Sequence, residues 1–154
     1  MAVGSKDVED WIRQVVAKTH KASGAAICPF AERALKDRKV QVVPAKVDVL
    51  AQVAQCCDLF NSLALDVVVL YFNYEITERK LSGLCRQCNH LSPNFAVMYD
   101  HPDNDGKHKG VSFSFGKAPL LFIQDMGKLK KAQQTLKKTG YYKAWGIKDF
   151  TQFF

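Results

Sequence analysis

Cys28 begins the segment of this chain with the clearest chemical potential, because a proline and a run of helix-forming residues follow it. Pro29 fits the first turn of a helix, so the pattern predicts that Cys28 lies at or near a helix N-cap. Unpaired N–H groups and the helix dipole stabilise negative charge at such a position. We therefore expect an activated Cys28 thiol with a lowered pKa, suited to act as a nucleophile or a metal ligand.

A polar loop at residues 100–110 supplies candidate partners for that thiol. It holds two histidines and three aspartates, and it follows a predicted strand. Sites in parallel sheets gather at the carboxyl ends of strands, so His101 is predicted to act as general base or acid, with Asp103 orienting its ring. Asp105 is predicted to contact the substrate. The alternative is a solvated loop in which these residues only form turns.

The same three residues, Cys28, His101 and Asp103, could instead hold a catalytic metal. One thiolate, one imidazole and one carboxylate suit zinc or ferrous iron with an open coordination position. The sequence therefore favours a small enzyme that uses thiol-based or metal-assisted chemistry. It identifies neither the substrate nor the reaction.

The four other cysteines are predicted to be small core residues. Cys85 and Cys88 share a helical face with leucines, and no second well-spaced Cys/His pair completes a zinc signature. Cys57 lies on the apolar face of its own helix, next to Cys56. The chain shows no export signal, so all five cysteines are expected to be reduced thiols of a cytoplasmic protein.

The net charge of +7 is concentrated in the last third of the chain. Residues 101–154 carry 10 lysines against 4 aspartates, and many of these lysines fall in a predicted helix at 125–140. Such a surface favours an anionic partner, which we expect to be a small molecule. The alternative function is a non-enzymatic basic adaptor that binds an acidic protein or nucleic acid through this helix. No apolar run is long enough to span a membrane.

The elements that must position these residues alternate between helix and strand. Apolar spacing predicts helices at about 7–16, 28–37, 50–60, 77–91 and 125–140. It predicts strands at 39–43, 66–72, 95–99, 111–115 and 120–123. This order is typical of a single α/β domain over 1–154, with a mixed, mostly parallel sheet of four to five strands flanked by helices. The aromatic tail, 141–154, is expected to pack on the body.

The order of the motifs resembles that of an uncharacterised bacterial family of small proteins, domain of unknown function 1415. The shared features are a leading helix with Trp11, the Cys-Pro-Phe-Ala segment at 28–31 and the His-Pro-Asp segment at 101–103. The resemblance implies that the three candidate site residues come together, and it supplies no activity. Lys117 stands where the family has an arginine, and we predict that it contacts the substrate.

A second resemblance is to glutaredoxin and thioredoxin-like proteins. The segment at 28–31, followed by a strand, is similar to a glutaredoxin active-site helix in which Ala31 replaces the second cysteine. The proline-led strand at 118–123 is similar to the strand that faces this cysteine in the thioredoxin fold. The chain departs from that fold in having a helix, not a strand, before Cys28. This resemblance implies thiol chemistry at Cys28.

Overall fold

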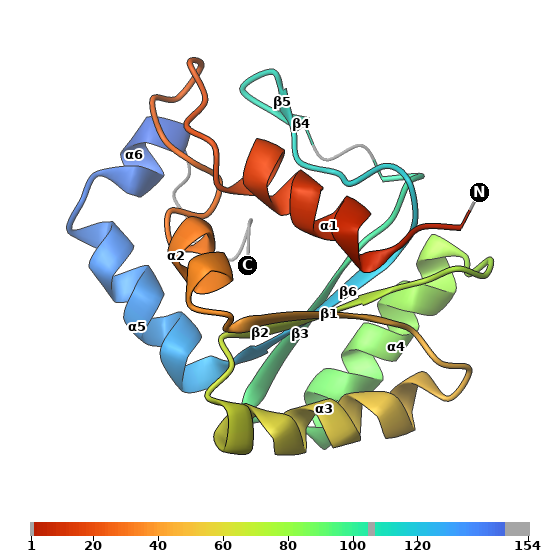
Figure 1. Ribbon diagram of the computed structural model, residues 1–154. Helices are drawn as coiled ribbons and strands as arrows, with labels where there is room; N and C mark the ends of the chain where they lie inside the picture. The colour runs from red at the N-terminus through yellow and green to blue at the C-terminus, as the bar shows by residue number, and fades with distance from the viewer. Residues whose placement is uncertain (1, 105–106, 147–154) are drawn as a thin grey trace.

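The computed structural model of the protein describes residues 2–104 and 107–146. Its centre is a four-stranded mixed sheet flanked by helices, which confirms the predicted α/β class (Figure 1). The helices are α1 (Ser5–Trp11), the short π-helix η1 (Ile12–Val16), α2 (Ala31–Lys36), α3 (Val49–Leu63), α4 (Glu78–Leu91), α5 (Met126–Lys137) and α6 (Tyr141–Trp145). The strands are β1 (Val40–Pro44), β2 (Val67–Tyr71), β3 (Phe95–Asp100), β4 (Lys107–His108), β5 (Val111–Ser112) and β6 (Leu120–Asp125).

The strand order of the main sheet is β1-β2-β6-β3, and its pairing corrects one prediction. β1 and β2 pair in parallel, but β6 lies between β2 and β3 and runs antiparallel to both. The expected mostly parallel pairing is therefore wrong. Helical crossovers through α3 and α4 make β1, β2 and β3 run in the same direction. In its described residues, the connection from β3 to β6 contains no such helix, and β6 runs antiparallel to β3.

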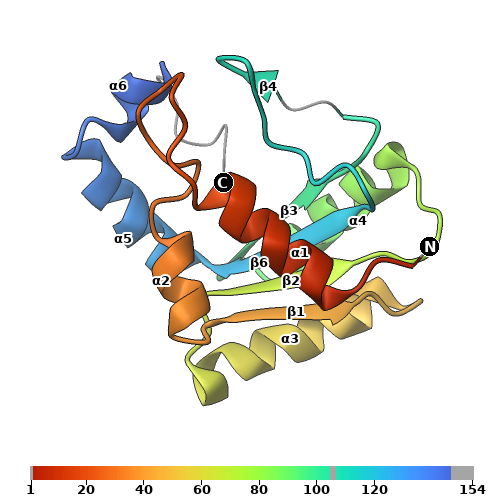
Figure 2. The same cartoon turned by 45° about the horizontal axis from the view of Figure 1, so that its top comes forward.

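Both faces of the sheet are covered at strand β2. Val68 and Leu70 of β2 pack in a cluster with α3 and α4, which we call the α3/α4 face. Val69 and Tyr71 pack on the opposite side with α1, η1 and α6, which we call the α1/α5 face because α5 also lies there. Figure 2 shows α1 lying across the sheet on the side opposite α3. Buried aliphatic side chains on both faces make this strand part of the core.

The α3/α4 face contains the cysteines that were predicted to be core residues. Cys56, Cys85 and Cys88 are buried there, and Cys57 is half-buried against the same cluster. Burial raises the pKa of Cys85 to about 12 and that of Cys88 to about 11. Across residues 2–104 and 107–146, no three His, Cys, Asp or Glu side chains are grouped so that they could hold a metal ion. These thiols therefore act as small apolar core groups.

The predicted strand at 111–115 is confirmed only at its start. Val111–Ser112 pairs with β4 in a two-stranded ribbon outside the main sheet. The Asp100 side chain instead holds the segment that follows: its Oδ2 atom accepts hydrogen bonds from the Phe115 amide at 2.9 Å and the Ser114 hydroxyl at 3.3 Å. The Asp100 side chain, at the end of β3, thus provides hydrogen bonds that a neighbouring strand would otherwise provide to this segment.

The described part of the aromatic C-terminal segment packs on the body. Tyr141 and Trp145 of α6 are buried. The Tyr141 hydroxyl donates to the carbonyl of Ile27, and the Trp145 indole nitrogen donates to the carbonyl of Ala26 at 3.0 Å. The remainder of the predicted tail, 147–154, lies outside the described residues. Helix α6 therefore fixes the backbone directly before Cys28.

Within the described ranges, every helix is too short or too polar to cross a lipid bilayer.

Candidate functional site

Cys28 lies in a turn before α2, not at the helix N-cap. The helix starts at Ala31 with Phe30 as its N-cap residue. The Cys28 amide donates to the carbonyl of Val16 at 2.9 Å, and the Cys28 carbonyl accepts from the Ala31 amide at 3.2 Å. These bonds fix the cysteine between η1 and α2, slightly ahead of the position that the proline pattern predicted.

The structure corrects the prediction that the Cys28 thiol is activated. Burial raises the pKa of this thiol, and this effect exceeds the lowering by the backbone N–H groups of Phe30 and Ala31. Asp66 raises the pKa further by charge repulsion. The backbone N–H groups at the helix start do stabilise the thiolate, but desolvation disfavours it more strongly. The thiol is therefore protonated at neutral pH.

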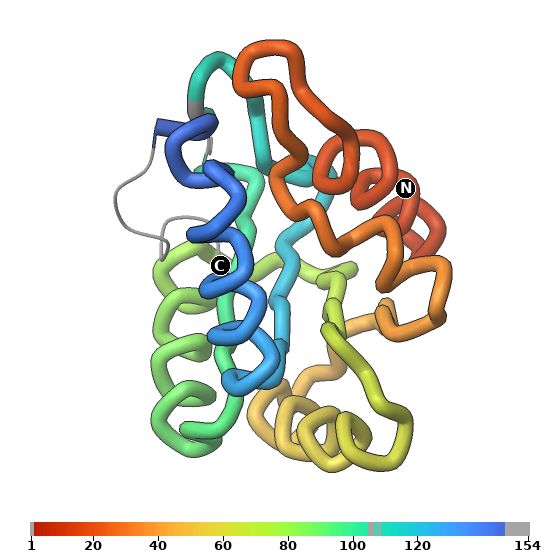
Figure 3. Tube along the Cα trace, turned by 90° about the vertical axis from the view of Figure 1, so that its left-hand side faces the viewer, coloured from red at the N-terminus to blue at the C-terminus, as the bar shows by residue number. Residues whose placement is uncertain are grey.

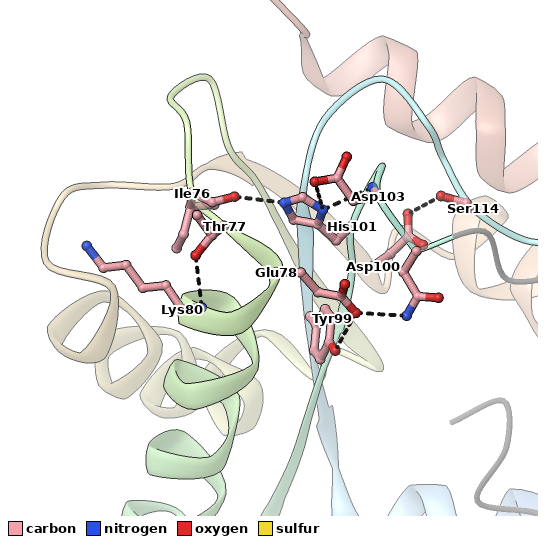
Figure 4. Close-up of polar contacts among 10 residues, drawn as sticks. Ile76, Thr77, Glu78, Lys80, Tyr99, Asp100, His101, Asp103 and Ser114 are labelled. Carbon is pink, nitrogen blue, oxygen red and sulfur yellow. Dashed lines mark hydrogen bonds and ion pairs between the residues drawn. The ribbon is translucent and has the colours of Figure 1, made fainter.

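His101 follows β3 and is buried, with both ring nitrogens engaged (Figure 4). Its Nε2 atom lies 2.7 Å from the carbonyl oxygen of Ile76, and its Nδ1 atom lies 3.1 Å from the amide nitrogen of Asp103. A carbonyl only accepts and an amide only donates, so these partners assign a neutral ring with its proton on Nε2. The ring joins the loop after β3 to the segment that leads into α4, which is a structural role.

Asp103 is close to His101, as predicted, but its carboxylate does not orient the ring from a buried position. Its Oδ2 atom lies 3.8 Å from His101 Nδ1, and its side chain is 81% exposed. The nearby Glu78 carboxylate instead accepts from the Tyr99 hydroxyl at 3.1 Å and from the Asn104 amide at 3.2 Å. Figure 4 shows these contacts gathered where α4 begins. These hydrogen bonds hold the loop after β3 against the first turn of α4.

Cys28 and His101 lie on opposite faces of the sheet and near opposite ends of β3. Cys28 packs against the α1/α5 face, whereas Ile76, the partner of His101, belongs to the α3/α4 face. Cys28 also lines a pocket with Asp125, and Asp125 pairs with Phe95, the first residue of β3. His101 instead directly follows Asp100, the last residue of that strand. That strand spans roughly 17 Å. The predicted Cys-His-Asp arrangement, whether catalytic or metal-binding, is therefore not assembled.

Of the two predicted substrate contacts, the one that the structure describes, Lys117, lies away from Cys28. Asp105 falls outside the described residues. Lys117 is exposed in the loop that leads into β6, and Leu120 of that strand pairs with Asp100 beside His101. Lys117 is therefore near the His101 end of the sheet.

A pocket of about 370 Å³ opens on the α1/α5 face, and Cys28 lines it. Its floor includes Val69 and Phe122 of the sheet, and α5 contributes Leu129 and Leu136. Figure 3 shows α5 and α6, in blue, beside the red-to-orange segment from α1 to α2, which closes the other side. Most of its lining is apolar. We call it the Trp11–Gln124 pocket after two further lining residues.

Two residues that line this pocket, Trp11 and Gln124, each carry an unpartnered polar atom. The indole Nε1 of Trp11 and the side-chain Oε1 of Gln124 are buried and lack any hydrogen-bond partner among the described residues. The Trp11 ring is held by Phe115 and Phe122, with ring centroids 5.7 and 6.1 Å away. One donor and one acceptor thus lie unpaired in residues that line an apolar cavity. Each such group costs about 1–3 kcal/mol while unpaired.

Sequence reasoning missed Gln124, although its position carried a signal. Residues alternate between faces along a strand, so Gln124 shares the α1/α5 face with Leu120 and Phe122, which are buried core residues. A polar residue in register with two core residues indicates either a buried hydrogen bond or a ligand contact. Trp11 gave no comparable signal, because its spacing on the first helix fits a core residue equally well.

Comparisons with protein-family models, with curated proteins and with solved structures gave no match to this chain. The two family resemblances drawn from the motifs stay predictions.

Proposed function

We propose that the protein binds a small, mainly apolar molecule in the Trp11–Gln124 pocket. The observation that carries this proposal is the combination of an apolar cavity with one buried donor and one buried acceptor that lack protein partners. Ligand sites in proteins have this character, with volumes of about 300–1,000 Å³ and a few convergent polar groups. An occupant that accepts from Trp11 and donates to Gln124 satisfies both atoms.

Binding has more support than catalysis by a Cys28–His101 pair. A nucleophile needs its base within hydrogen-bond reach, and His101 already bonds to Ile76 and Asp103 on the other face of the sheet. The Asp66 carboxylate raises the pKa of the Cys28 thiol by charge repulsion, so it does not activate the thiol. The enzymatic hypothesis stays a prediction. In the binding proposal, the protonated Cys28 thiol is part of the apolar wall.

The basic-adaptor alternative has less support. Helix α5 presents exposed lysines, but Lys128 is engaged with Asp66 at 3.3 Å and with the Leu65 carbonyl at 2.9 Å. The apolar residues of α5 line the pocket, so this helix has a role inside the molecule.

Calorimetric titration with two neutral probes, 1-octanol and 2-naphthol, tests the proposed function. One is linear and the other aromatic, and each has a hydroxyl that both donates and accepts. We expect saturable one-to-one binding of at least one probe, because the pocket desolvates the apolar body and pairs the hydroxyl.

Two variants of α5 locate the binding. Ala132→Phe places a ring in the pocket and should abolish binding, whereas Gln134→Phe adds the same ring at an exposed position outside the lining and should not. Circular dichroism checks that both variants fold. Absence of saturable binding with both probes, or binding that Ala132→Phe leaves unchanged, would overturn the proposal.

A further inference from the structure

We propose that the segment at residues 147–154 docks its apolar side chains in the Trp11–Gln124 pocket and competes there with the ligand. The competition rests on the proposed function, whereas the docking is testable without any ligand. The segment contains four large apolar side chains among its eight residues, Ile147, Phe150, Phe153 and Phe154. Apolar side chains at this density are rarely left together in water, so the segment needs an apolar surface to cover it.

Helix α5 forms an apolar wall of the pocket that the described part of the chain leaves incompletely covered. Among the described residues, α3 buries five and α4 buries three, but none of the twelve residues of α5 is buried. Leu129, Ala132 and Leu136 follow the spacing of one helical face, and all three are half-buried where they line the pocket. Phe30, which also lines the pocket, is 41% exposed. An apolar segment inserted here removes these surfaces from water.

The end of α6 brings the 147–154 segment close to this pocket. Tyr141 and Tyr142 line the pocket, and Gly146 follows Tyr142 by four residues, which is about 6 Å along the helix. Gly146 has a φ of 69°, the left-handed conformation that ends a helix and turns the chain away from its axis. Eight extended residues reach up to about 26 Å. Helix α5 is about 18 Å long, so the segment can reach all of that wall.

Methyl NMR spectra of the ¹³C-methyl-labelled protein test the docking without a ligand. An aromatic ring shifts the resonances of methyl groups that it contacts. The triple variant Phe150→Ser, Phe153→Ser and Phe154→Ser removes every ring from the segment. It should therefore shift the methyl signals of Leu129 and Leu136. Signals of these two leucines that do not move in the triple variant would overturn the proposal.

A matched control separates docking from a general effect of changing the segment. Thr151→Ser combined with Gln152→Ser alters the same segment and leaves all its rings in place, so it should shift neither leucine. The methyl signals of Leu70, in the core of the α3/α4 face, should stay in place in both variants and so report that the sheet is intact. Equal shifts at Leu129 in the control and in the triple variant would also contradict docking of the rings.

Calorimetric titration of the same variants with 2-naphthol tests the competition. A segment that occupies the pocket about nine-tenths of the time weakens the apparent affinity about tenfold, so the triple variant should bind 2-naphthol more tightly by up to that factor. The serine control should bind it as the unmodified protein does. Equal or weaker binding by the triple variant would overturn the competition. If neither 2-naphthol nor 1-octanol binds any of these proteins, the proposed function falls, and the methyl shifts still decide the docking.

Discussion

At the scale of single residues, the unpartnered atoms of Trp11 and Gln124 distinguish the candidate site from ordinary core. Gln52, another buried glutamine, shows the contrast: its Oε1 accepts from the Lys46 amide at 2.7 Å, and its Nε2 donates to the Pro44 carbonyl at 2.9 Å. Its polar groups therefore stabilise the fold. The Gln124 oxygen has no such partner in the described protein, so its burial costs stability unless a ligand or water occupies the pocket.

Replacing each glutamine by methionine should change stability in opposite directions. Gln124→Met removes an unpaired acceptor at similar volume and should raise the free energy of unfolding by about 1 kcal/mol. Gln52→Met leaves two backbone groups unpaired and should lower it by about 1–3 kcal/mol. Urea unfolding without added ligand measures both. A loss of stability in Gln124→Met would mean that the oxygen is paired in the free protein.

The Cys28 thiol should react slowly, because burial raises its pKa. With a disulfide reagent at about pH 8, the rate at Cys28 should be lower in the folded protein than in urea, and its rise with pH should occur above the usual cysteine range. Mass spectrometry assigns the modified site. A folded-state rate at or above that of the unfolded chain would restore the activated-thiol hypothesis.

At the scale of elements, local signals predicted the starts of α3, α4 and α5 to within one residue. The Thr77 hydroxyl accepts from the Lys80 amide at 3.2 Å, and Asp125 caps α5 in the same way, both as their side chains and positions suggested. The position of β6 between β2 and β3 could not be predicted, because the apolar run at 120–123 fits any central strand and contains no information on its neighbours. The separation of Cys28 from His101 follows from the packing of distant elements.

Asn89 of α4 stabilises the edge strand β3 by acting as a strand neighbour. Its amide group donates to the Val97 carbonyl at 2.9 Å and accepts from the Val97 amide at 2.8 Å. Asn89→Ala should therefore lower the free energy of unfolding by about 1–3 kcal/mol and accelerate hydrogen exchange at the Val97 amide. Gln87→Ala, at an exposed site of the same helix, is the control. Unchanged exchange at Val97 would contradict this role.

At the scale of the whole molecule, the alternation of expected helices and strands predicted an α/β protein, but it did not show that the two faces of the sheet differ. The α3/α4 face is a dense core that includes buried thiols, whereas the α1/α5 face holds the pocket. The charged C-terminal third was predicted to favour an anionic partner. An excess of charge spread over a third of the chain does not indicate which side chain would contact such a partner.

The buried thiols should make the protein less stable at alkaline pH. The folded-state pKa values of Cys85, about 12, and Cys88, about 11, exceed the value of about 8.5 in an unfolded chain. The contribution is fully present below the unfolded value and is lost as pH rises toward the folded values, because the unfolded chain releases protons first. Urea unfolding between about pH 7.5 and 10.5 measures the decline, which should be shallower in Cys85→Ala. An unchanged slope in that variant would contradict the assignment.

The most direct test of the binding proposal is the indole N–H resonance of Trp11 in a ¹⁵N-labelled protein titrated with 1-octanol. Trp145 provides an internal reference, because its indole already donates to the Ala26 carbonyl in the core. Trp11→Phe assigns the two signals. We predict a saturable shift of the Trp11 signal as its unpaired donor gains an acceptor, while the Trp145 signal stays in place. A Trp11 signal that does not move at saturating octanol would contradict the proposed binding site.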